Sequence, residues 1–490
     1  MGKHHHHIDR RKFLGQASCA AIGTTTFLSS ILNLKAMGAA SILNSATSAA
    51  GDYKAIVCLL NSGGADSFNM LIPRENEDYQ TYAATRSNMA IPSESIIPLS
   101  GTGNDGKSYG VHPSFPRFAS MYNEGKLAFI TNIGTLVQPI TRQQFWEGNT
   151  PLPLGLYSHS DQVMHWQTGM PDKRESIGWG GRIADLLTSA NENRTLSMNL
   201  TLSGSNIFQT GNSSIEYSIN PIEGALQIYD FNESWVVPKM RRQAIERMLQ
   251  QSYSNIFKDQ YVSTIKQSIE GADYLNAALA LPNNFDEIFT PFAEIDSEGN
   301  VLSTDEYGRD NLSNSFKTVA RIIAGHETTK LSRQIFFIDF NGWDHHDNLL
   351  ENQTAMFTGL DTLVYDFQRA MESIGMSDQV TVFSMSEFSR TLTSNGNGTD
   401  HAWGGNVFVS GGAVQGGKMY GQFPDLRLGL VNDLEIGGGV LIPTTSVDTY
   451  FAELALWFGV PKSELSSLFP KLGNFYDQSS TSNPIGFLKS

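Results

Sequence analysis

The sequence predicts an α/β fold with buried parallel strands and flanking helices, interrupted by a mostly helical insertion. The first observation is a set of short, continuously apolar runs, which are typical of parallel strands buried on both faces. The second is helical spacing of apolar residues between such runs, as over residues 354–374. The third is a change of sequence pattern near residue 222, after which amphipathic helical patterns replace strand-like runs until about residue 317.

The elements follow in chain order. Strands are predicted at 54–60, 126–131, 335–339, 380–384 and 406–410. Helical spacing covers 236–253, 260–281 and 315–323 within the insertion, and a last amphipathic helix over 446–458 is stopped by Gly459 and Pro461. These patterns divide the chain into a leader (1–50), a first core part (51–221), the helical insertion (222–317), a second core part (318–478) and a loose tail (479–490).

Composition excludes some classes of partner and of site. The formal net charge is -15, and no basic block follows the N-terminal segment, so binding of nucleic acid through its phosphates is not expected. The two cysteines are Cys19 in the leader and Cys58 in the first strand-like run. This leaves no internal disulfide framework, and the apolar neighbours of Cys58 favour a buried core thiol over a catalytic one.

The N-terminal segment is predicted to be an export signal. Arg10-Arg11 precede Phe13-Leu14 and a weakly apolar stretch rich in Ala, Gly and Thr, which resembles a twin-arginine signal. The alternative is a basic arm followed by a soluble helix. No later stretch has the roughly 18 uninterrupted apolar residues of a membrane span. We therefore expect a periplasmic or secreted protein without a membrane span in its mature part.

Two clusters place a carboxylate beside an imidazole after predicted strands. Asp344-His345-His346 follow the run 335–339, and Asp400-His401 lie in a glycine-rich loop after the run 380–384. Such pairs offer a divalent metal one hard oxygen and one borderline nitrogen in a single loop. The alternative is that the aspartates are turn residues and the histidines are exposed. The two clusters together favour a metal site.

Two further loops carry candidate residues. Asp66 and Asn69 follow the first strand, where ligands of open parallel sheets gather, although Asp66 equally suits a helix N-cap. Ser158 and His159 stand at a possible helix start, which favours an activated nucleophile because helix-terminal N–H groups stabilise negative charge. Ser158 could instead cap the helix, with Asp161 completing an arrangement that resembles a capping box.

These residues together carry a family resemblance. The ordered set resembles the exported bacterial family called domain of unknown function 1501, which is in turn similar to the alkaline phosphatase and sulfatase superfamily. That resemblance implies a mainly parallel sheet flanked by helices, with a divalent-metal site at the carboxyl ends of the strands. The segments that carry it are the paired arginines, Gly63-Gly64-Ala65-Asp66-Ser67-Phe68-Asn69, Ser158-His159, Gly342-Trp343-Asp344-His345-His346, Ser386-Glu387-Phe388-Ser389-Arg390-Thr391 and Gly398-Thr399-Asp400-His401.

The resemblance also implies roles. Asp66 matches the first metal-binding aspartate of the superfamily, Asp344 with His346 its Asp–His pair, and His401 with Asp400 its late histidine, while His345 competes with His346. Glu387 stands where many relatives have Asp-His, which departs from a standard two-zinc site. Ser158 would be the nucleophile, although the sulfatase sequence after the nucleophile is absent. Arg390 would contact an oxyanion or form a surface salt bridge.

Two functions remain open at this level. The first is a metal-dependent hydrolase of phosphate or sulfate esters, acting on a small-molecule or glycan ester with zinc, calcium, magnesium or manganese. The second is a non-catalytic scaffold or binding protein of the same superfamily, which keeps a metal for stability. The sequence names no protein partner.

Overall fold

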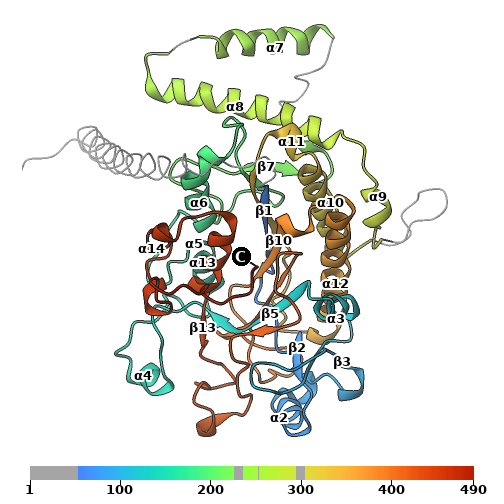
Figure 1. Cartoon of the computed structure of the whole chain (residues 1–490), viewed down its shortest axis with the longest axis vertical. Coiled ribbons are helices and arrows are strands. Elements are labelled where there is room, and N and C mark those ends of the chain that lie inside the picture. Colours follow the sequence, from blue (N-terminus) through green and yellow to red (C-terminus); the bar gives the residue numbers. More distant parts are fainter. Residues whose placement is uncertain (1–52, 226–234, 252, 294–303, 490) are drawn as a thin grey trace, which may run out of the picture.

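The computed structural model describes residues 53–225, 235–251, 253–293 and 304–489, and the predicted leader lies outside these described residues. Most strands join one ten-stranded sheet in the order β12-β5-β11-β10-β1-β9-β6-β7-β8, with β13 paired to β5 (Figure 1). Its strands are β1 (Lys54–Leu60), β5 (Leu127–Gly134), β6 (Asn199–Thr201), β7 (Tyr217–Asn220), β8 (Gly224–Ala225), β9 (Arg333–Asp339), β10 (Val380–Met385), β11 (Gly405–Ser410), β12 (Met419–Tyr420) and β13 (Thr445–Ser446). A small second sheet contains β2 (Leu71–Pro73), β3 (Ile97–Pro98) and β4 (Tyr109–Val111).

The centre of the large sheet is parallel. β1 pairs in parallel with β10 on one side and with β9 on the other, and β6 and β7 continue the parallel arrangement beyond β9. β11 is antiparallel to both β10 and β5, and β8 is antiparallel to β7. The predicted mainly parallel sheet flanked by helices is therefore confirmed, and each of the five predicted strands is part of it.

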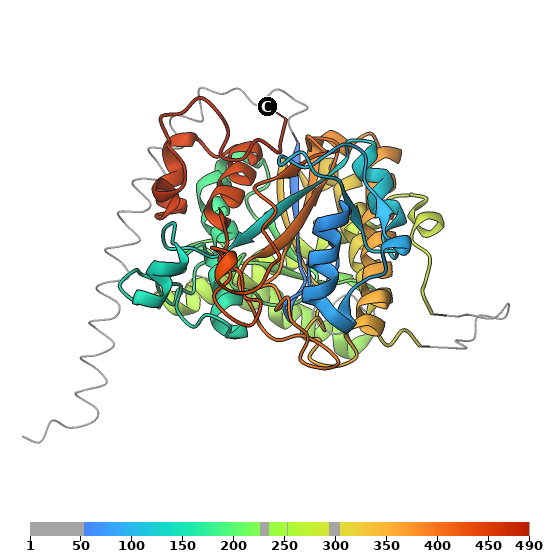
Figure 2. The same ribbon diagram turned by 90° about the horizontal axis from the view of Figure 1, so that it is seen from below.

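Successive side chains of β1 enter two different cores, as the period of two in a strand requires. Ala55, Val57 and Leu59 pack with one helical layer, whereas Ile56 and Cys58 pack with the other. Cys58 is a buried free thiol, as predicted. The two layers lie on opposite sides of the sheet (Figure 2). The first contains α3 (Pro116–Asn123), α10 (Arg309–Ala324) and α12 (Leu349–Ser373); the second contains α5 (His159–Thr168), α6 (Trp179–Leu187), α13 (Val447–Phe458) and α14 (Leu465–Leu468).

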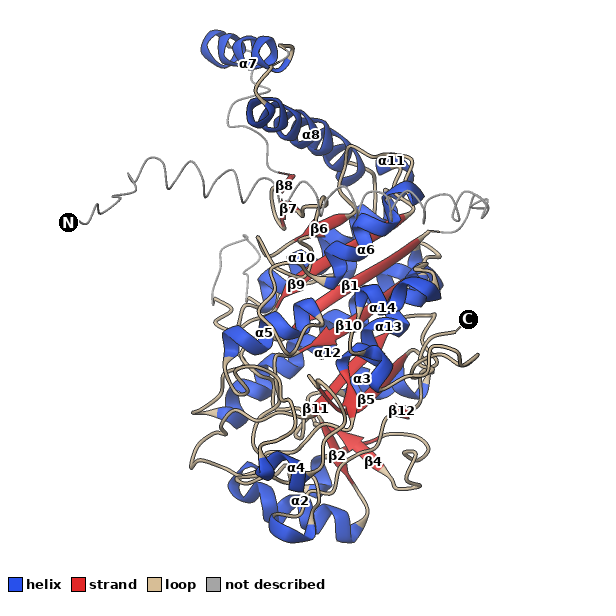
Figure 3. Ribbon diagram, turned by 90° about the vertical axis from the view of Figure 1, so that its left-hand side faces the viewer, coloured by secondary structure: helices blue, strands red, loops and turns tan. Residues whose placement is uncertain are grey.

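The segment predicted as a helical insertion is helical over most of its described residues. It contains α7 (Val236–Leu249), α8 (Ile256–Leu279), α9 (Phe285–Ile288) and the start of α10. The C-terminal half of α8 packs against α10 and against α11 (His326–Thr329), while α7 lies beyond α8, away from the sheet (Figure 3). None of the described helices combines the length and the apolar character needed to cross a membrane.

The C-terminal tail is anchored rather than loose, which corrects the sequence prediction. Glu453 of α13 accepts hydrogen bonds from the backbone N–H groups of Ile485, Gly486 and Leu488. Leu488 also forms a β-bridge with Val414, and its side chain is buried in the second core. The polar composition of residues 479–484 concealed this anchor, because the partner carboxylate lies on a helix about thirty residues earlier.

A buried carboxyl at the start of α13 gives a prediction for pH. Asp448 is fully buried, and burial raises its pKa from 3.8 to about 7. The folded state therefore binds a proton that the unfolded state has lost, and stability falls as pH rises between these two values. Its Oδ2 accepts from the Ser446 hydroxyl, whereas its Oδ1 has no partner among the residues that the structure describes.

We expect Asp448→Asn to stabilise the protein by about 2 kcal/mol at pH 8. Removing the ionisation cost gains about 4 kcal/mol, from which an unsatisfied buried amide subtracts about 1–3 kcal/mol. Near pH 5 the two proteins should unfold at about the same urea concentration, because the ionisation cost that remains there, about 1.6 kcal/mol, is offset by the cost of the buried amide. Urea unfolding at both pH values measures this difference. A variant with equal stability gain at pH 5 and pH 8 would contradict the assignment to Asp448.

Candidate metal centre

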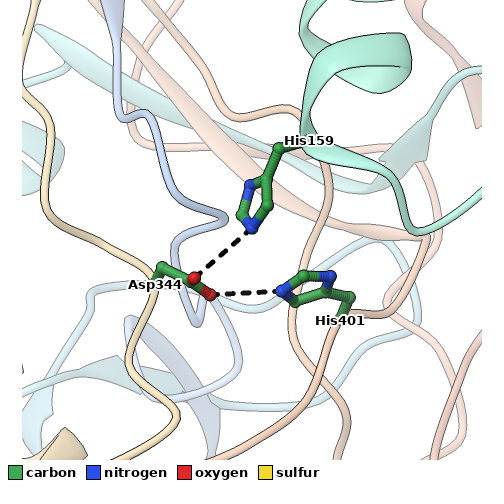
Figure 4. A group of neighbouring side chains, drawn as sticks. All are labelled: His159, Asp344 and His401. Carbon is green, nitrogen blue, oxygen red and sulfur yellow. Dashed lines mark hydrogen bonds and ion pairs between the residues drawn. The ribbon is translucent and has the colours of Figure 1, made fainter.

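Three side chains from distant parts of the chain meet at one edge of the large sheet (Figure 4). Asp344 follows β9, and His401 precedes β11. Because β11 is antiparallel to β10, its first residues lie at the same edge as the carboxyl ends of β9 and β10. His159 is the first residue of α5, in the second helical layer, and its side chain points toward Asp344 (Figure 4). Strand ends of an open sheet are where such sites form.

The donor atoms of His159, Asp344 and His401 all lie within 4.8 Å of one another, close enough to hold one metal ion. His159 Nε2 is 3.4 Å from Asp344 Oδ2, and His401 Nε2 is 3.2 Å from Asp344 Oδ1. The Asp344 side chain is 43% exposed. Three protein donors with an open side are the arrangement of a metal site that also binds water or substrate.

Both histidines are held through their other ring nitrogen. His401 Nδ1 lies 2.8 Å from the carbonyl oxygen of Tyr157, and His159 Nδ1 lies 2.9 Å from Glu387 Oε1. A carbonyl and a carboxylate only accept, so each Nδ1 carries the proton. In the neutral rings each Nε2 then presents a lone pair toward Asp344. This pattern, with an outer acceptor that fixes the tautomer, is typical of metal-ligating histidines.

Glu387 is the hydrogen-bond acceptor for the His159 ring. Its side chain is almost completely buried, and Oε1 accepts from the Gly63 N–H at 2.7 Å as well as from His159. The hydrogen bond that His159 donates to Glu387 raises the pKa of His159 above its ordinary value. Glu387 Oε2 has no partner among the described residues. Glu387 therefore positions the His159 imidazole.

Arg390 is a buried ion-pair partner rather than a surface one. Its Nη1 donates to Asp344 Oδ1 at 2.8 Å and to the Gly63 carbonyl, while Nε and Nη2 donate to Thr399. Burial alone would raise the pKa of Asp344, but the hydrogen bond and charge of Arg390 outweigh it and hold that pKa below its ordinary value. Asp344 thus stays ionised, with Oδ2 turned to His159 and away from Arg390.

His346 and Asp400 lie at the exposed rim. His346 Nε2 is 3.0 Å from His401 Nε2 and 3.1 Å from Asp344 Oδ1, and its Nδ1 is 3.2 Å from Asp400 Oδ1. Their side chains are 44% and 62% exposed. His346 is therefore available as a fourth donor, and Asp400 is placed to orient it.

Part of the centre falls within a region that matches a known family. Residues 228–435 match the model of the family described as protein of unknown function (DUF1501). The resemblance predicted from the sequence is confirmed over this range. The matched range includes Asp344, Glu387, Arg390 and His401, whereas His159 lies before it.

Comparisons with solved structures give distant likenesses. The chain is similar to the crystal structure of Ps i-CgsB in complex with k-i-k-neocarrahexaose (11% identity, TM-score 0.32, covering 84% of this chain and 72% of that chain). It is also similar to the PsFucS1 sulfatase from Pseudoalteromonas sp. (10%, TM-score 0.34, 88% and 72%). A third is the lipoteichoic acid synthase LtaP from Listeria monocytogenes (8%, TM-score 0.26, 80% and 76%). No curated protein matches the chain.

Two residues predicted as ligands do not join the centre. The Asp66 carboxylate forms an ion pair with Arg86, and both side chains are completely buried. Asn69 lies in the same network, where its Oδ1 accepts from Tyr82 and Arg86 and its Nδ2 donates to Gln353. The sequence prediction of these residues as metal ligands is corrected here, because a buried guanidinium already neutralises the carboxylate.

His345 is turned away from its neighbours. Its side chain is buried against the Trp343 ring, at 5.9 Å between ring centroids, and burial lowers the pKa of His345 to about 4. The competition between His345 and His346 is therefore decided in favour of His346. The backbone turns here through hydrogen bonds from His345 N to the Trp343 carbonyl and from His346 N to the Asp344 carbonyl, and the Asp344 and His346 side chains lie together at the centre.

Ser158 neither caps α5 nor joins the centre in this conformation. It occupies the N-cap position, but its side chain accepts no bond from the helix, so the capping-box alternative is wrong. Its Oγ lies 3.2 Å from Ser160 Oγ, while Asp161 pairs with Arg174. The preceding Tyr157 has a positive φ of 72°, and its carbonyl holds His401. The structure therefore places His159, not Ser158, among the donor atoms.

Sequence reasoning missed the packing residues of the centre. The Phe388 ring lies 4.6 Å from His401 and 4.9 Å from His159, between ring centroids, and so fixes both imidazoles. Gly63 and Gly64 permit the close approach of the loops. A Cβ at Gly63 would meet Asp344 N at 2.5 Å, and one at Gly64 would meet the Phe388 ring. The Gly63-Gly64 pair in the sequence was the available signal for this close approach.

Proposed function

We propose that this chain is an exported, metal-dependent hydrolase of phosphate or sulfate esters. The observation that carries the proposal is the pair of imidazoles whose Nδ1 atoms are anchored and whose Nε2 atoms face one ionised carboxylate. The ester class comes from the family resemblance of the sequence. Two nitrogens and one oxygen favour zinc over calcium, magnesium and manganese, which prefer oxygen ligands.

A divalent ion bound there would polarise an ester oxygen and lower the pKa of a bound water or hydroxyl. The residues of the chain then have separate tasks. Asp344, His159 and His401 would hold the ion, and Glu387 and the Tyr157 carbonyl fix the two rings. Phe388 excludes water from one side of the rings, since it packs on both. Arg390 keeps Asp344 ionised and balances part of the negative charge.

The nucleophile is either the Ser158 hydroxyl or water. Ser158 directly precedes His159 at the N-terminus of the ten-residue helix α5, where backbone N–H groups favour developing negative charge. Its hydroxyl would have to turn from Ser160 toward the centre. This resting orientation is the observation that supports the second candidate, a scaffold or binding protein that keeps the metal without turnover.

The test begins with metal analysis of the purified protein, followed by assays with aryl phosphate and aryl sulfate esters. We expect about one zinc ion per chain, and turnover of at least one ester class. His401→Ala should reduce both metal content and turnover, because it removes a donor. Ser158→Ala should abolish turnover and leave metal content intact if the serine is the nucleophile.

Two other outcomes lead to different conclusions. Full turnover by Ser158→Ala would assign the attack to water. Metal bound at full occupancy with every ester inert would replace the hydrolase by the scaffold. Ser160→Ala is the matched control, because it removes the hydroxyl that contacts Ser158 without touching the centre.

Export is the remaining part of the proposal. The paired Arg10-Arg11 before Phe13-Leu14 support the twin-arginine route, which carries folded proteins and so permits metal loading before export. We expect replacement of both arginines by Lys to leave the protein in the cytoplasm. Fractionation of cells, followed by immunoblotting of the cytoplasmic and periplasmic fractions, measures this. Unchanged export of the double variant would refute the route.

A further inference from the structure

A helical arm stands off from the body at the edge of the large sheet. We define the arm as α7 and the first part of α8, residues 235–266. In this segment α7 packs on α8, and α8 meets the body mainly through its later residues, such as Leu275 and Leu279 (Figures 1 and 3). The outer side of α7 is therefore not covered by any described part of the chain.

The outer side of α7 carries an apolar stripe, with the exposed Arg241 and Arg247 in or beside it. Val236, Met240, Ala244 and Met248 follow one another at spacings of four and so share one face, while Pro238 and Leu249 are buried on the other side. The arm holds seven of the sixteen large apolar side chains that are exposed among the described residues. They are Trp235, Val236, Val237, Met240, Met248, Phe257 and Tyr261. Such a concentration marks an interaction surface.

The arm also differs from the rest of the chain in charge. Residues 235–266 contain six basic and two acidic residues, a net charge of +4 in a chain of net charge -15. Arg242 pairs with Glu246, whereas Lys239, Arg241 and Arg247 form no ion pair with any described residue. Long cationic side chains beside an apolar face can bury their stems and keep their charges at an anionic surface.

We propose that the arm docks on the surface of an anionic lipid bilayer and lies along that surface without crossing it. Apolar side chains including Trp, with Lys and Arg beside them, are the composition of helices that bind at the headgroup boundary. A second copy of the chain is the less favourable occupant, because a two-fold contact between two arms would oppose two charges of +4. Phosphate headgroups instead complement that charge.

Vesicle co-sedimentation tests the proposal. The full chain is mixed at low salt with vesicles of phosphatidylcholine alone or of phosphatidylcholine with phosphatidylglycerol. We expect sedimentation with the anionic vesicles only, weakened by added salt. Lys239→Glu with Arg247→Glu should weaken binding at least about tenfold, since each cation near the surface contributes to attraction. Trp235→Ser with Met240→Ser should weaken it too, and Ser at the N-cap preserves α7.

Matched controls change equal numbers of exposed residues elsewhere. Arg74→Glu with Lys418→Glu controls for net charge, and Leu430→Ser with Val431→Ser controls for exposed apolar area. Every protein keeps residues 1–50, so a contribution of the leader is common to all. Equal binding by the wild type and both arm variants, or no binding by the wild type, would overturn the proposal. So would a lipid-free dimer that the arm variants convert to monomers, because it assigns the face to a second copy.

Discussion

Replacing Asp66 by Asn is expected to lower the free energy of unfolding by about 3–5 kcal/mol while leaving the metal content of the folded protein unchanged. Asp66 and Arg86 form an ion pair in which both side chains are completely buried. Removing the carboxylate leaves a buried, uncompensated guanidinium, and this is the costly way to break such a pair. The remaining contacts of Arg86, to the Thr391 carbonyl and Asn69 Oδ1, do not neutralise its charge. Urea unfolding and metal analysis of the folded fraction measure the two quantities.

The control is the exposed pair between Asp78 and Lys107, in which both side chains are about one-third to one-half exposed. Asp78→Asn should change stability by less than about 1 kcal/mol, as is usual for exposed pairs. The double variant Asp66→Asn with Arg86→Met should be less destabilised than the sum of the two single variants, because the stranded charge is gone. An Asp66→Asn protein of normal stability that has lost its metal would restore Asp66 as a ligand.

Much of the fold could be predicted from the sequence because a strand that is buried on both faces is a continuous run of apolar residues. The six residues Ala55 to Leu60 of β1 are all buried, and their unbroken apolar run predicted a central parallel strand. The helix boundaries were less well predicted. Tertiary packing extends α12 back to Leu349 and α10 back to Arg309, where the local apolar spacing alone did not indicate a helix.

Short edge strands left no such trace. β6 has three residues and β8 has two, so neither is long enough to show alternation. β6 forms by pairing with β9, and β8 forms by pairing with β7. Both pairings depend on the assembled sheet and not on the local sequence. The antiparallel β11 was predicted as a strand, but its direction depends on the path of the preceding loop.

The residues of the centre were predictable only where one short loop contains the complete sequence motif. Asp344, His346 and His401 could be named because each lies within a short motif after a strand or in a glycine-rich loop. The same reasoning misplaced Asp66, because its partner Arg86 lies on α2 (Asn76–Arg86) and has no local signature. It also favoured Ser158 over His159, since the hydrogen bond from His159 to Glu387 joins residues that are 228 apart in the chain.

Replacing Asp344 by Asn is expected to weaken metal binding by more than about 100-fold without unfolding the protein. Residues that only hydrogen-bond to a metal ligand typically contribute roughly 10–100-fold to affinity. The loss at Asp344 should be larger, because Asp344 is the only carboxylate among the donors His159, Asp344 and His401. The fold should persist with some loss of stability, because Asp344 is 43% exposed and water at this open side can screen the Arg390 charge, unlike at the completely buried Asp66 pair. Titration of the metal-free proteins with zinc, followed by calorimetry, gives the affinity.

The rim residue Asp400 provides the matched comparison for Asp344. It is 62% exposed and touches the centre only through His346 Nδ1, at 3.2 Å. Asp400→Asn should therefore weaken zinc binding by no more than about tenfold, at the lower limit for an outer partner. The order of the two effects is what the geometry requires, because Asp344 faces both His159 and His401, whereas Asp400 faces neither. Zinc affinity that is equal in both variants and in the wild type would place the metal elsewhere and remove His159, Asp344 and His401 as its site.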